Sequence, residues 1–533
     1  MSFRSPFWRW LAVAASVGAF LWVVAQCYLP GKGFTYFVMF GEKQSGRYLP
    51  ELKAINYYAL DDSYGYDAQY YAQMAMRPHL ADPELAQAVD SLPYRARRIL
   101  FCWTAWLASG GDPVRALHVY AVQNVAAWLL LAWLLLRWFP PGGGWQNFLR
   151  WAGVMFSFGL CFSVRGALVD GPSLLLIAAG LALAEMGRPW LSAAILGVSG
   201  LGKETNILAG SGLALPGENT WRAWLRFGLQ VMVVVLPLGL WLAFVTMRVG
   251  MATEMGERNF DLPFHAYAVK WQAAAAQFGQ EGLGSVAKWN LLSQVALTVQ
   301  FLFFALRLRW REAWWRVGAS YAVLMMFLGD AVWEGYPGAA SRVLLPMLLA
   351  FNILVPRGRR WWLVLLLGNL SVVVSPDLLK PPAQVSFQVE GPRALGMIEK
   401  SGRTVEAIFD AGWYQQERSL WEYWRWARGS AGFTIRNPQP FAIAAEVKFG
   451  LRSNDVRHVR VWLGDRMVWE GSTSTKLQSV NVSTILPPGD QIWRLETSEP
   501  PVPPGSGKEQ LRQLTFSLRD LVITLKERAP AGP

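Results

Sequence analysis

Three carboxylates in one tyrosine-rich stretch are the first candidates for chemistry. Residues 57–76 read YYALDDSYGYDAQYYAQMAM and contain Asp61, Asp62 and Asp67. A carboxylate can take the proton of an attacking hydroxyl group as a general base. Asp67 directly precedes the helix-compatible run 68–76, so capping of that helix is an alternative or additional role. Asp61 and Asp62 are equally well explained as turn residues.

A group of arginines follows this stretch. The segment YRARRILFCW carries Arg95, Arg97 and Arg98. Each guanidinium offers a planar set of hydrogen-bond donors that suits a phosphate group. The alternative is a solvated cluster, or one whose charges are paired with carboxylates. The apolar segment 99–109 that comes next is expected to lie along a membrane interface.

Further charged residues stand at the ends of separate apolar runs. They are Arg165, Asp170, Lys203, Glu204, Asp330, Glu334 and Arg342. Any single pair of them is more often a structural ion pair than a functional site. Alternation of the apolar runs across a membrane would place all of them on one side. A cavity that opens on that side is therefore the economical hypothesis.

The composition indicates a membrane protein. Of the 533 residues, 53% are hydrophobic and 16% are charged, whereas soluble domains carry about 25% charged residues. These values exclude a disordered chain and a small disulfide scaffold. Residues 10–29 contain no charge and follow Arg4 and Arg9. This predicts a retained first membrane helix with a cytoplasmic N-terminus, and a cleaved signal peptide is the alternative.

Uncharged runs recur as far as residue 376. Three further runs are about long enough to span a bilayer, namely 116–136, 227–247 and 289–306. Shorter runs occupy 151–164, 171–184, 189–202, 205–217, 317–329, 343–356 and 361–376. Together they predict roughly eleven transmembrane helices, some of which could be re-entrant.

The net charge of +13 has two interpretations. In a soluble protein it would suggest nucleic-acid binding. Here arginine clusters such as 307–316 and 357–360 lie between apolar runs, so we read them as cytoplasmic turns and expect no nucleic acid. The opposite, periplasmic or extracytoplasmic side then receives the loop 30–115, the loop 249–288 and everything after 377. The chain is accordingly predicted to be a multi-pass protein of the inner (cytoplasmic) membrane.

Cysteine and histidine are sparse in this chain. Three cysteines and four histidines are scattered without metal-type spacing. We therefore expect neither a His/Cys metal site nor a disulfide framework. No cofactor is required by the sequence, although Asp61 and Asp62 could hold a divalent metal.

The chain changes character after about residue 384. Stretches such as 456–471 and 513–527 alternate with a period of two, which is typical of strands, and Pro- and Gly-rich segments separate them. This predicts a transmembrane domain over 1–380 and an all-β, jelly-roll-like sandwich over 384–533 on the outer face.

Tryptophans crowd the beginning of this second part, in the segment 412–429. Aromatic faces suit the rings of sugars, so a carbohydrate-binding role follows naturally. The alternative is that these side chains form the core of the sandwich or its contact with the membrane. The candidate carbohydrate contacts are Trp413, Trp424 and Trp426.

Four short motifs resemble those of the GT-C superfamily of polytopic glycosyltransferases. They are YDAQYY at 66–71, YRARRIL at 94–100, KET at 203–205 and SRVL at 341–344. The resemblance covers roughly residues 8–375 and is nearest to a bacterial group with a YDGQFY-like first-loop motif, whose glycine is replaced here by Ala68. It implies a GT-C-like fold and inverting transfer of a sugar from a polyprenyl-phosphate-linked donor to an acceptor on the extracytoplasmic membrane face.

The resemblance also implies roles for individual residues. GT-C enzymes typically use a first-loop Asp as general base, and the matching residue is Asp67. The departing phosphate keeps its charge and needs cations, for which Arg98, Lys203 and Arg342 are candidates. The full set of candidate substrate- and phosphate-binding residues is Asp61, Asp62, Gln69, Tyr70, Arg95, Arg98, Lys203, Glu204, Glu334 and Arg342.

The implied partners are the polyprenyl-phosphate sugar donor, a glycan, lipid or protein acceptor, and the lipid bilayer. Two other functions remain open. A transporter or flippase of lipid-linked saccharides often has internal repeats and broken helices at the membrane midplane, and the sequence contains no convincing repeat. An oligosaccharide ligase or polymerase would share the outer site and would differ in using a pyrophosphate-linked glycan as donor.

Overall fold

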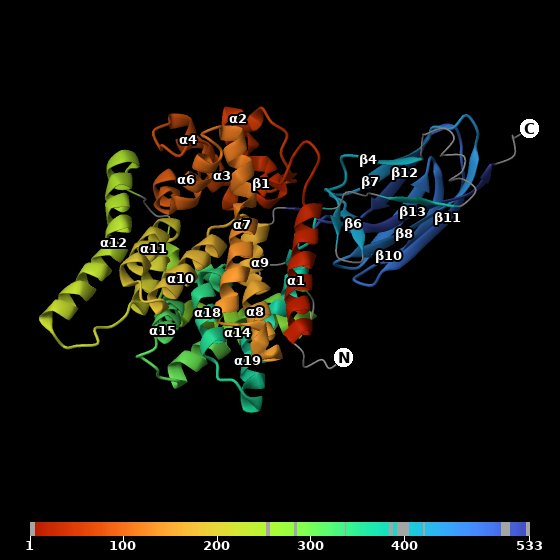
Figure 1. The fold of residues 1–533 in the computed structure, drawn as a ribbon. Coiled ribbons are helices and arrows are strands. Elements are labelled where there is room, and N and C mark those ends of the chain that lie inside the picture. Colours follow the sequence, from red (N-terminus) through yellow and green to blue (C-terminus); the bar gives the residue numbers. More distant parts are fainter. Residues whose placement is uncertain are drawn as a thin grey trace, which may run out of the picture. The chain divides into compact units, whose positions relative to one another are not determined.

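The computed structural model divides the chain into two compact units (Figure 1). The helical unit consists of Met1–Ala59 and Gly65–Leu379, and the β unit consists of Leu60–Tyr64 and Lys380–Pro533. The structure describes residues 6–251, 256–281, 285–335, 337–382, 387–391, 405–418, 422–502 and 512–528.

The helical unit is built from helices of very different lengths. Its α-helices are α1 Pro6–Gln26, α2 Pro50–Lys53, α3 Ala68–Met76, α4 Pro83–Ala88, α5 Leu92–Arg95, α6 Leu100–Ala108, α7 Pro113–Leu134, α8 Trp145–Met155, α9 Phe158–Arg165, α10 Asp170–Glu185, α11 Pro189–Gly202, α12 Trp221–Val249, α13 His265–Glu281, α14 Ser285–Leu306, α15 Ala313–Phe327, α16 Asp330–Trp333, α17 Ala340–Val343, α18 Leu345–Leu354, α19 Trp362–Gly368 and α20 Ser375–Leu378.

Short 3₁₀ helices and one strand pair complete this part of the chain. The 3₁₀ helices are η1 Thr35–Phe37, η2 Glu42–Arg47, η3 Ala96–Arg98, η4 Leu135–Arg137, η5 Pro141–Gly143, η6 Glu204–Gly212, η7 Glu257–Asn259, η8 Arg359–Trp361 and η9 Leu370–Val374. The two-residue strands β1 Phe40–Gly41 and β2 Ala59–Leu60 pair with each other.

Several helices are long and apolar enough to cross a membrane, which indicates a membrane protein. Among the described residues there are four, at Pro6–Gln26, Pro113–Arg137, Trp221–Val249 and Ala287–Leu306. Two bent pairs, Trp145–Met155 with Phe158–Arg165 and Arg359–Gly368 with Leu370–Leu378, raise the number to six if each pair is one span. The remaining apolar runs of the sequence form shorter helices, and the run 205–217 folds largely as the 3₁₀ helix η6.

Identifiable residues set the bends and close contacts of these helices. The first pair bends by 44° where Ser157 caps α9 by accepting a hydrogen bond from the Leu160 N–H. Its side chain takes over a bond that an unbroken helix would make along its backbone. Gly197 lets α11 approach α12 closely, because a Cβ there would lie 2.4 Å from the Val233 carbonyl oxygen. Small residues allow this kind of close packing between membrane helices.

Helices α2 to α6 form a layer at one end of the helical unit, and α19 lies at the other end (Figure 1). Buried amide groups hold this layer together. The Gln69 Oε1 accepts hydrogen bonds from the Tyr48 hydroxyl at 2.7 Å and the Gly41 N–H at 3.2 Å. One turn further along α3, the Gln73 Oε1 accepts the Leu49 N–H at 2.9 Å. These bonds tie α3 to the preceding segment and fix the position of the residue before it, Asp67.

The β unit contains two sheets. Its strands are β3 Gln388–Glu390, β4 Glu406–Phe409, β5 Glu417–Arg418, β6 Tyr423–Trp426, β7 Ala431–Asn437, β8 Ile443–Ser453, β9 Arg457–Leu463, β10 Arg466–Thr473, β11 Gln478–Leu486, β12 Gly489–Thr497 and β13 Phe516–Arg528. One sheet has the order β10-β9-β12-β7-β4, and the other has the order β11-β8-β13-β6-β5 with β3 parallel to β13. All other neighbouring strands are antiparallel.

The strands β6 to β13 alternate between the two sheets in chain order, except that β9 and β10 are neighbours in one sheet. This gives the halves β6-β13-β8-β11 and β7-β12-β9-β10, which is the double Greek-key order of a jelly roll. The inward-facing side chains of both sheets form one apolar core. The Phe433 ring of β7 stacks on Trp493 of β12 and meets the edge of Phe449 of β8, so it links the two sheets.

Candidate active site

Asp67 occupies the position that caps α3, but its side chain does not act as a cap. It makes no hydrogen bond to the first turn of that helix. Its carboxylate instead pairs with Arg95, at 3.0 Å between Oδ1 and Nη2. The side chain remains 35% exposed. The capping interpretation is therefore wrong, and the carboxylate is placed where a second molecule can reach it.

Arg95 is held firmly by other groups. Its side chain is buried, and Nε and Nη2 donate to both oxygens of Asp90 at 3.0 and 2.7 Å. The guanidinium also lies over the rings of Tyr70, Tyr71 and Tyr94, at 5.1 to 5.6 Å from their centroids. Because Asp90 orients the guanidinium, Arg95 can face Asp67 without rearrangement.

The electrostatic surroundings of Asp67 favour its ionised form. Burial by itself raises the pKa of the carboxyl group. The charges of Arg95, Arg342 and Arg98 outweigh this effect and hold the pKa below its usual range. Asp67 is therefore a carboxylate at neutral pH, as a proton acceptor must be before it reacts.

Arg98 forms a second ion pair beside the first. Its Nε donates to Glu204 at 2.7 Å. Its Nη1 and Nη2 donate to the hydroxyls of Tyr71 and Tyr94 at 3.3 and 3.4 Å. These contacts join the first loop to the start of η6, which lies more than one hundred residues further along the chain.

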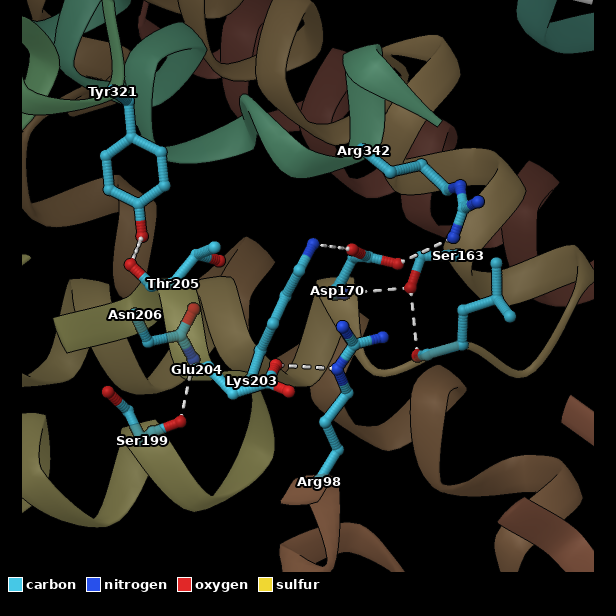
Figure 2. A network of polar contacts seen from close by, with 12 residues as sticks. Arg98, Ser163, Asp170, Ser199, Lys203, Glu204, Thr205, Asn206, Tyr321 and Arg342 are labelled. Atoms are coloured by element: carbon cyan, nitrogen blue, oxygen red, sulfur yellow. Dashed lines mark hydrogen bonds and ion pairs between the residues drawn. The ribbon is translucent and has the colours of Figure 1, made fainter. Parts of the chain in front are cut away.

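Asp170 joins two more cations (Figure 2). Its Oδ1 accepts the Lys203 ammonium at 2.5 Å and its Oδ2 accepts the Arg342 guanidinium at 3.1 Å. The Asp170 side chain is only 3% exposed, so an unpaired charge there would be costly. Arg342 also donates to the Tyr66 hydroxyl at 2.8 Å, which brings it to the residue next to Asp67.

Local hydrogen bonds place these charges. The Ser163 hydroxyl accepts the Gly171 N–H and donates toward the Leu168 carbonyl oxygen, which shapes the turn before Asp170 (Figure 2). Beyond Lys203, the Asn206 amide donates to the Ser199 carbonyl oxygen and the Tyr321 hydroxyl donates to the Thr205 carbonyl oxygen. We call the eight charged residues the ion-pair network: Asp67, Asp90, Arg95, Arg98, Asp170, Lys203, Glu204 and Arg342.

The structure brings together most of the candidate residues of the helical unit. Besides the network, Gln69 is buried in support of α3, and the Tyr70 ring lies against Arg95. Glu334 is different. It forms an ion pair with Arg258 in which both side chains are at least half exposed, and among the described residues it makes no bond to the network.

Asp61 and Asp62 belong to the β unit. The Asp61 carboxylate accepts the Gln415 N–H at 2.8 Å, and the Asp62 carboxylate accepts the Tyr414 hydroxyl at 3.1 Å. Asp62 also has a positive φ of 52°, as the turn interpretation of this pair would expect. These bonds hold Asp61 and Asp62 against the segment that contains Tyr414 and Gln415. A role of either residue in binding substrate stays a prediction.

The three candidate tryptophans differ in accessibility. Trp413 is 4% exposed, donates to the Gly432 carbonyl oxygen and packs against Phe409 and Phe516 in the core of the β unit. Its ring cannot stack on a sugar, so that assignment is wrong and the core alternative holds. Trp424 and Trp426 are half-buried on β6 and remain candidates.

Two network members were not among the candidate site residues. The sequence marks Asp170 only as a charge at the end of an apolar run, and no motif points to Asp90. Asp90 lies five residues before Arg95, and that spacing between opposite charges was the available signal. Among the described residues, no group of three or more His, Cys, Asp or Glu side chains is placed to hold a metal ion.

Comparisons with known proteins do not assign the chain to a family. No model of a protein family matches the chain, and no curated protein matches it significantly.

Proposed function

We propose that this chain is a membrane glycosyltransferase of the GT-C type. It would transfer a sugar from a polyprenyl-phosphate-linked donor to an acceptor hydroxyl on the extracytoplasmic face, with inversion at C1. The observation that carries the proposal is the accessible Asp67 carboxylate, which pairs with Arg95 and feels the charges of Arg98 and Arg342. One reachable base beside several cations suits the chemistry of this reaction.

In the proposed reaction Asp67 removes the proton of the acceptor hydroxyl. The acceptor oxygen forms a bond to C1 of the sugar while the bond from C1 to the phosphate oxygen breaks, and the electron pair leaves with polyprenyl phosphate. The phosphate is already a good leaving group, so no separate acid is needed. The products are the glycoside, the polyprenyl phosphate anion and a protonated Asp67.

The charges of the ion-pair network support this sequence of events. Four cations and four carboxylates balance before reaction. When Asp67 takes up a proton, its negative charge disappears and the network gains one net positive charge. This happens as negative charge develops on the departing phosphate oxygen. Arg98, Lys203 and Arg342 are the cations that we assign to this oxygen.

The proposal includes the finer features that the resemblance implies. About eleven membrane segments would cross the inner membrane, with several of the short or bent helices as partial spans. The N-terminus would be cytoplasmic, and the layer α2–α6 and the β unit would be extracytoplasmic. Trp424 and Trp426 would provide a carbohydrate contact on the β unit.

The direct test uses the purified full chain in sealed proteoliposomes with a mixture of glycan and lipid acceptors. A labelled polyprenyl-phosphate hexose is the donor in one reaction, and a pyrophosphate-linked oligosaccharide is the donor in a parallel one. The expected result is release of polyprenyl phosphate together with labelled, anomerically inverted product. Movement of intact donor between leaflets without cleavage would contradict transfer and favour a flippase. Cleavage of a pyrophosphate-linked oligosaccharide alone would favour a ligase.

A further inference from the structure

A separate cavity lies at the opposite end of α10 from Asp170, beside Glu185. Its volume is about 550 Å³, and it is lined by Glu185, Arg309, Glu312, Trp314, the stretch 353–356 and Arg357. These residues come from the end of α10, from the end of α18 and the residues after it, and from the start of α15 and the segment before it. Ligand sites in proteins commonly measure roughly 300 to 1,000 Å³. The cavity is therefore large enough for the head of a small molecule or lipid.

Both carboxylates of this cavity already have partners. Glu185 pairs with Arg137 at 3.1 Å and accepts the indole N–H groups of Trp138 and Trp314. Glu312 pairs with Arg309 at 3.2 Å. Neither acid is left to compensate a further cation.

Of the two arginines that line the cavity, Arg357 is the one whose charge no carboxylate of the described residues balances. Its Nε donates weakly to Asn147, at 3.4 Å, and in the described part of the chain it has no carboxylate partner. Arg150 lies near enough for the two charges to repel, and it donates only to the carbonyl oxygens of Asn352 and Pro356. Two neighbouring guanidinium groups thus lack a counter-charge in the described residues, which favours an anionic ligand.

The rest of the lining is apolar. The stretch 353–356 reads ILVP, and Trp314 presents its indole beside it. Leu306 and Leu308, in the segment that leads to Arg309, are exposed. A phosphate on a hydrocarbon stem fits this surface better than a free anion does, because the stem covers the exposed Leu306 and Leu308 and the partly exposed Ile353 and Pro356, which would otherwise face water.

We propose that this cavity binds the phosphate headgroup of an acidic phospholipid, with Arg357 on the phosphate and the apolar wall on the glycerol and the upper acyl chains. Basic pockets between membrane helices bind anionic lipid heads in this way, and each nearby cation contributes about 1 kcal/mol, or roughly fivefold in affinity. The site is independent of the proposed transferase reaction.

The test is native mass spectrometry of the full chain equilibrated with phosphatidylglycerol and phosphatidylcholine. The wild-type chain should retain phosphatidylglycerol preferentially. Arg357→Gln should lower this retention about fivefold, whereas Arg357→Lys, which keeps the charge, should preserve most of it. Arg226→Gln is the matched control, because Arg226 is exposed on α12 outside the cavity, and it should retain phosphatidylglycerol as the wild-type chain does.

Two results would overturn the proposal. One is equal retention of phosphatidylglycerol by the wild-type chain and Arg357→Gln. The other is complete displacement of the lipid by inorganic phosphate with the same protection against thermal unfolding, which would assign the cavity to a soluble anion.

Discussion

At the scale of single residues, Asp67 joins two properties that a general base needs. It is ionised at neutral pH, and part of its side chain is open to a second molecule. The sequence indicated Asp67 through the tyrosine-rich stretch and the arginines through the separate segment YRARRIL. It could not show that Asp90 fixes Arg95 or that Asp170 joins Lys203 to Arg342, because those contacts depend on how separate helices meet.

Replacing Arg95 should change the pH dependence of the reaction. Arg95→Gln removes the nearest charge that lowers the pKa of Asp67, so that pKa should rise. Since only the carboxylate accepts a proton, activity would then be lost at a higher pH as the medium is acidified. The measurement is the pH profile of kcat/KM for sugar transfer. Arg115→Gln, an exposed residue near the start of α7, serves as control; an acid limb that does not move in Arg95→Gln would contradict this role.

At the scale of elements, Asp170 of α10 joins Lys203, which follows α11, to Arg342 of α17. The sequence predicted the apolar runs and the strands of the β unit, because hydrophobic period and length are local properties. It could not predict which short runs would bend, since the break at Ser157 depends on a cap. Nor did the sequence predict that Asp61 and Asp62 belong to the β unit, because this placement depends on contacts with residues more than 350 positions away.

Loss of the Asp170 carboxylate should destabilise the helical unit. Asp170→Asn would leave Lys203 and Arg342 buried without their shared counter-charge, at a cost of about 3–5 kcal/mol. Thermal and denaturant unfolding of the detergent-solubilised chain measures this. The matched control is Glu334→Gln, which breaks a solvent-exposed pair and should leave the stability nearly unchanged. Equal stability of the two variants would show that the buried pairing contributes little.

At the scale of the whole molecule, the proposed function requires Asp67 and the arginine-rich turns to lie on opposite sides of a membrane. The sequence indicates this through the positions of its arginine clusters. The structure supplies apolar helices of suitable length, and the orientation stays a prediction.

Cysteine labelling can determine the orientation. The three native cysteines are buried, so they should react slowly with a membrane-impermeant thiol reagent. A cysteine placed at the exposed Gln87, in the layer α2–α6, should be labelled from outside intact spheroplasts. One placed at the exposed Arg311 should be labelled only after the membrane is opened. Labelling of both positions from the same side would refute the proposed topology.

The most direct test of the central claim is the rate of sugar transfer by Asp67→Asn. This change keeps the shape of the side chain and removes its ability to accept a proton. We predict that kcat falls about 10²- to 10⁴-fold, while the KM for the polyprenyl-phosphate donor and the unfolding temperature stay near those of the wild-type chain and of Glu84→Gln, an exposed carboxylate of the same loop. Transfer by Asp67→Asn at the wild-type rate would contradict the account.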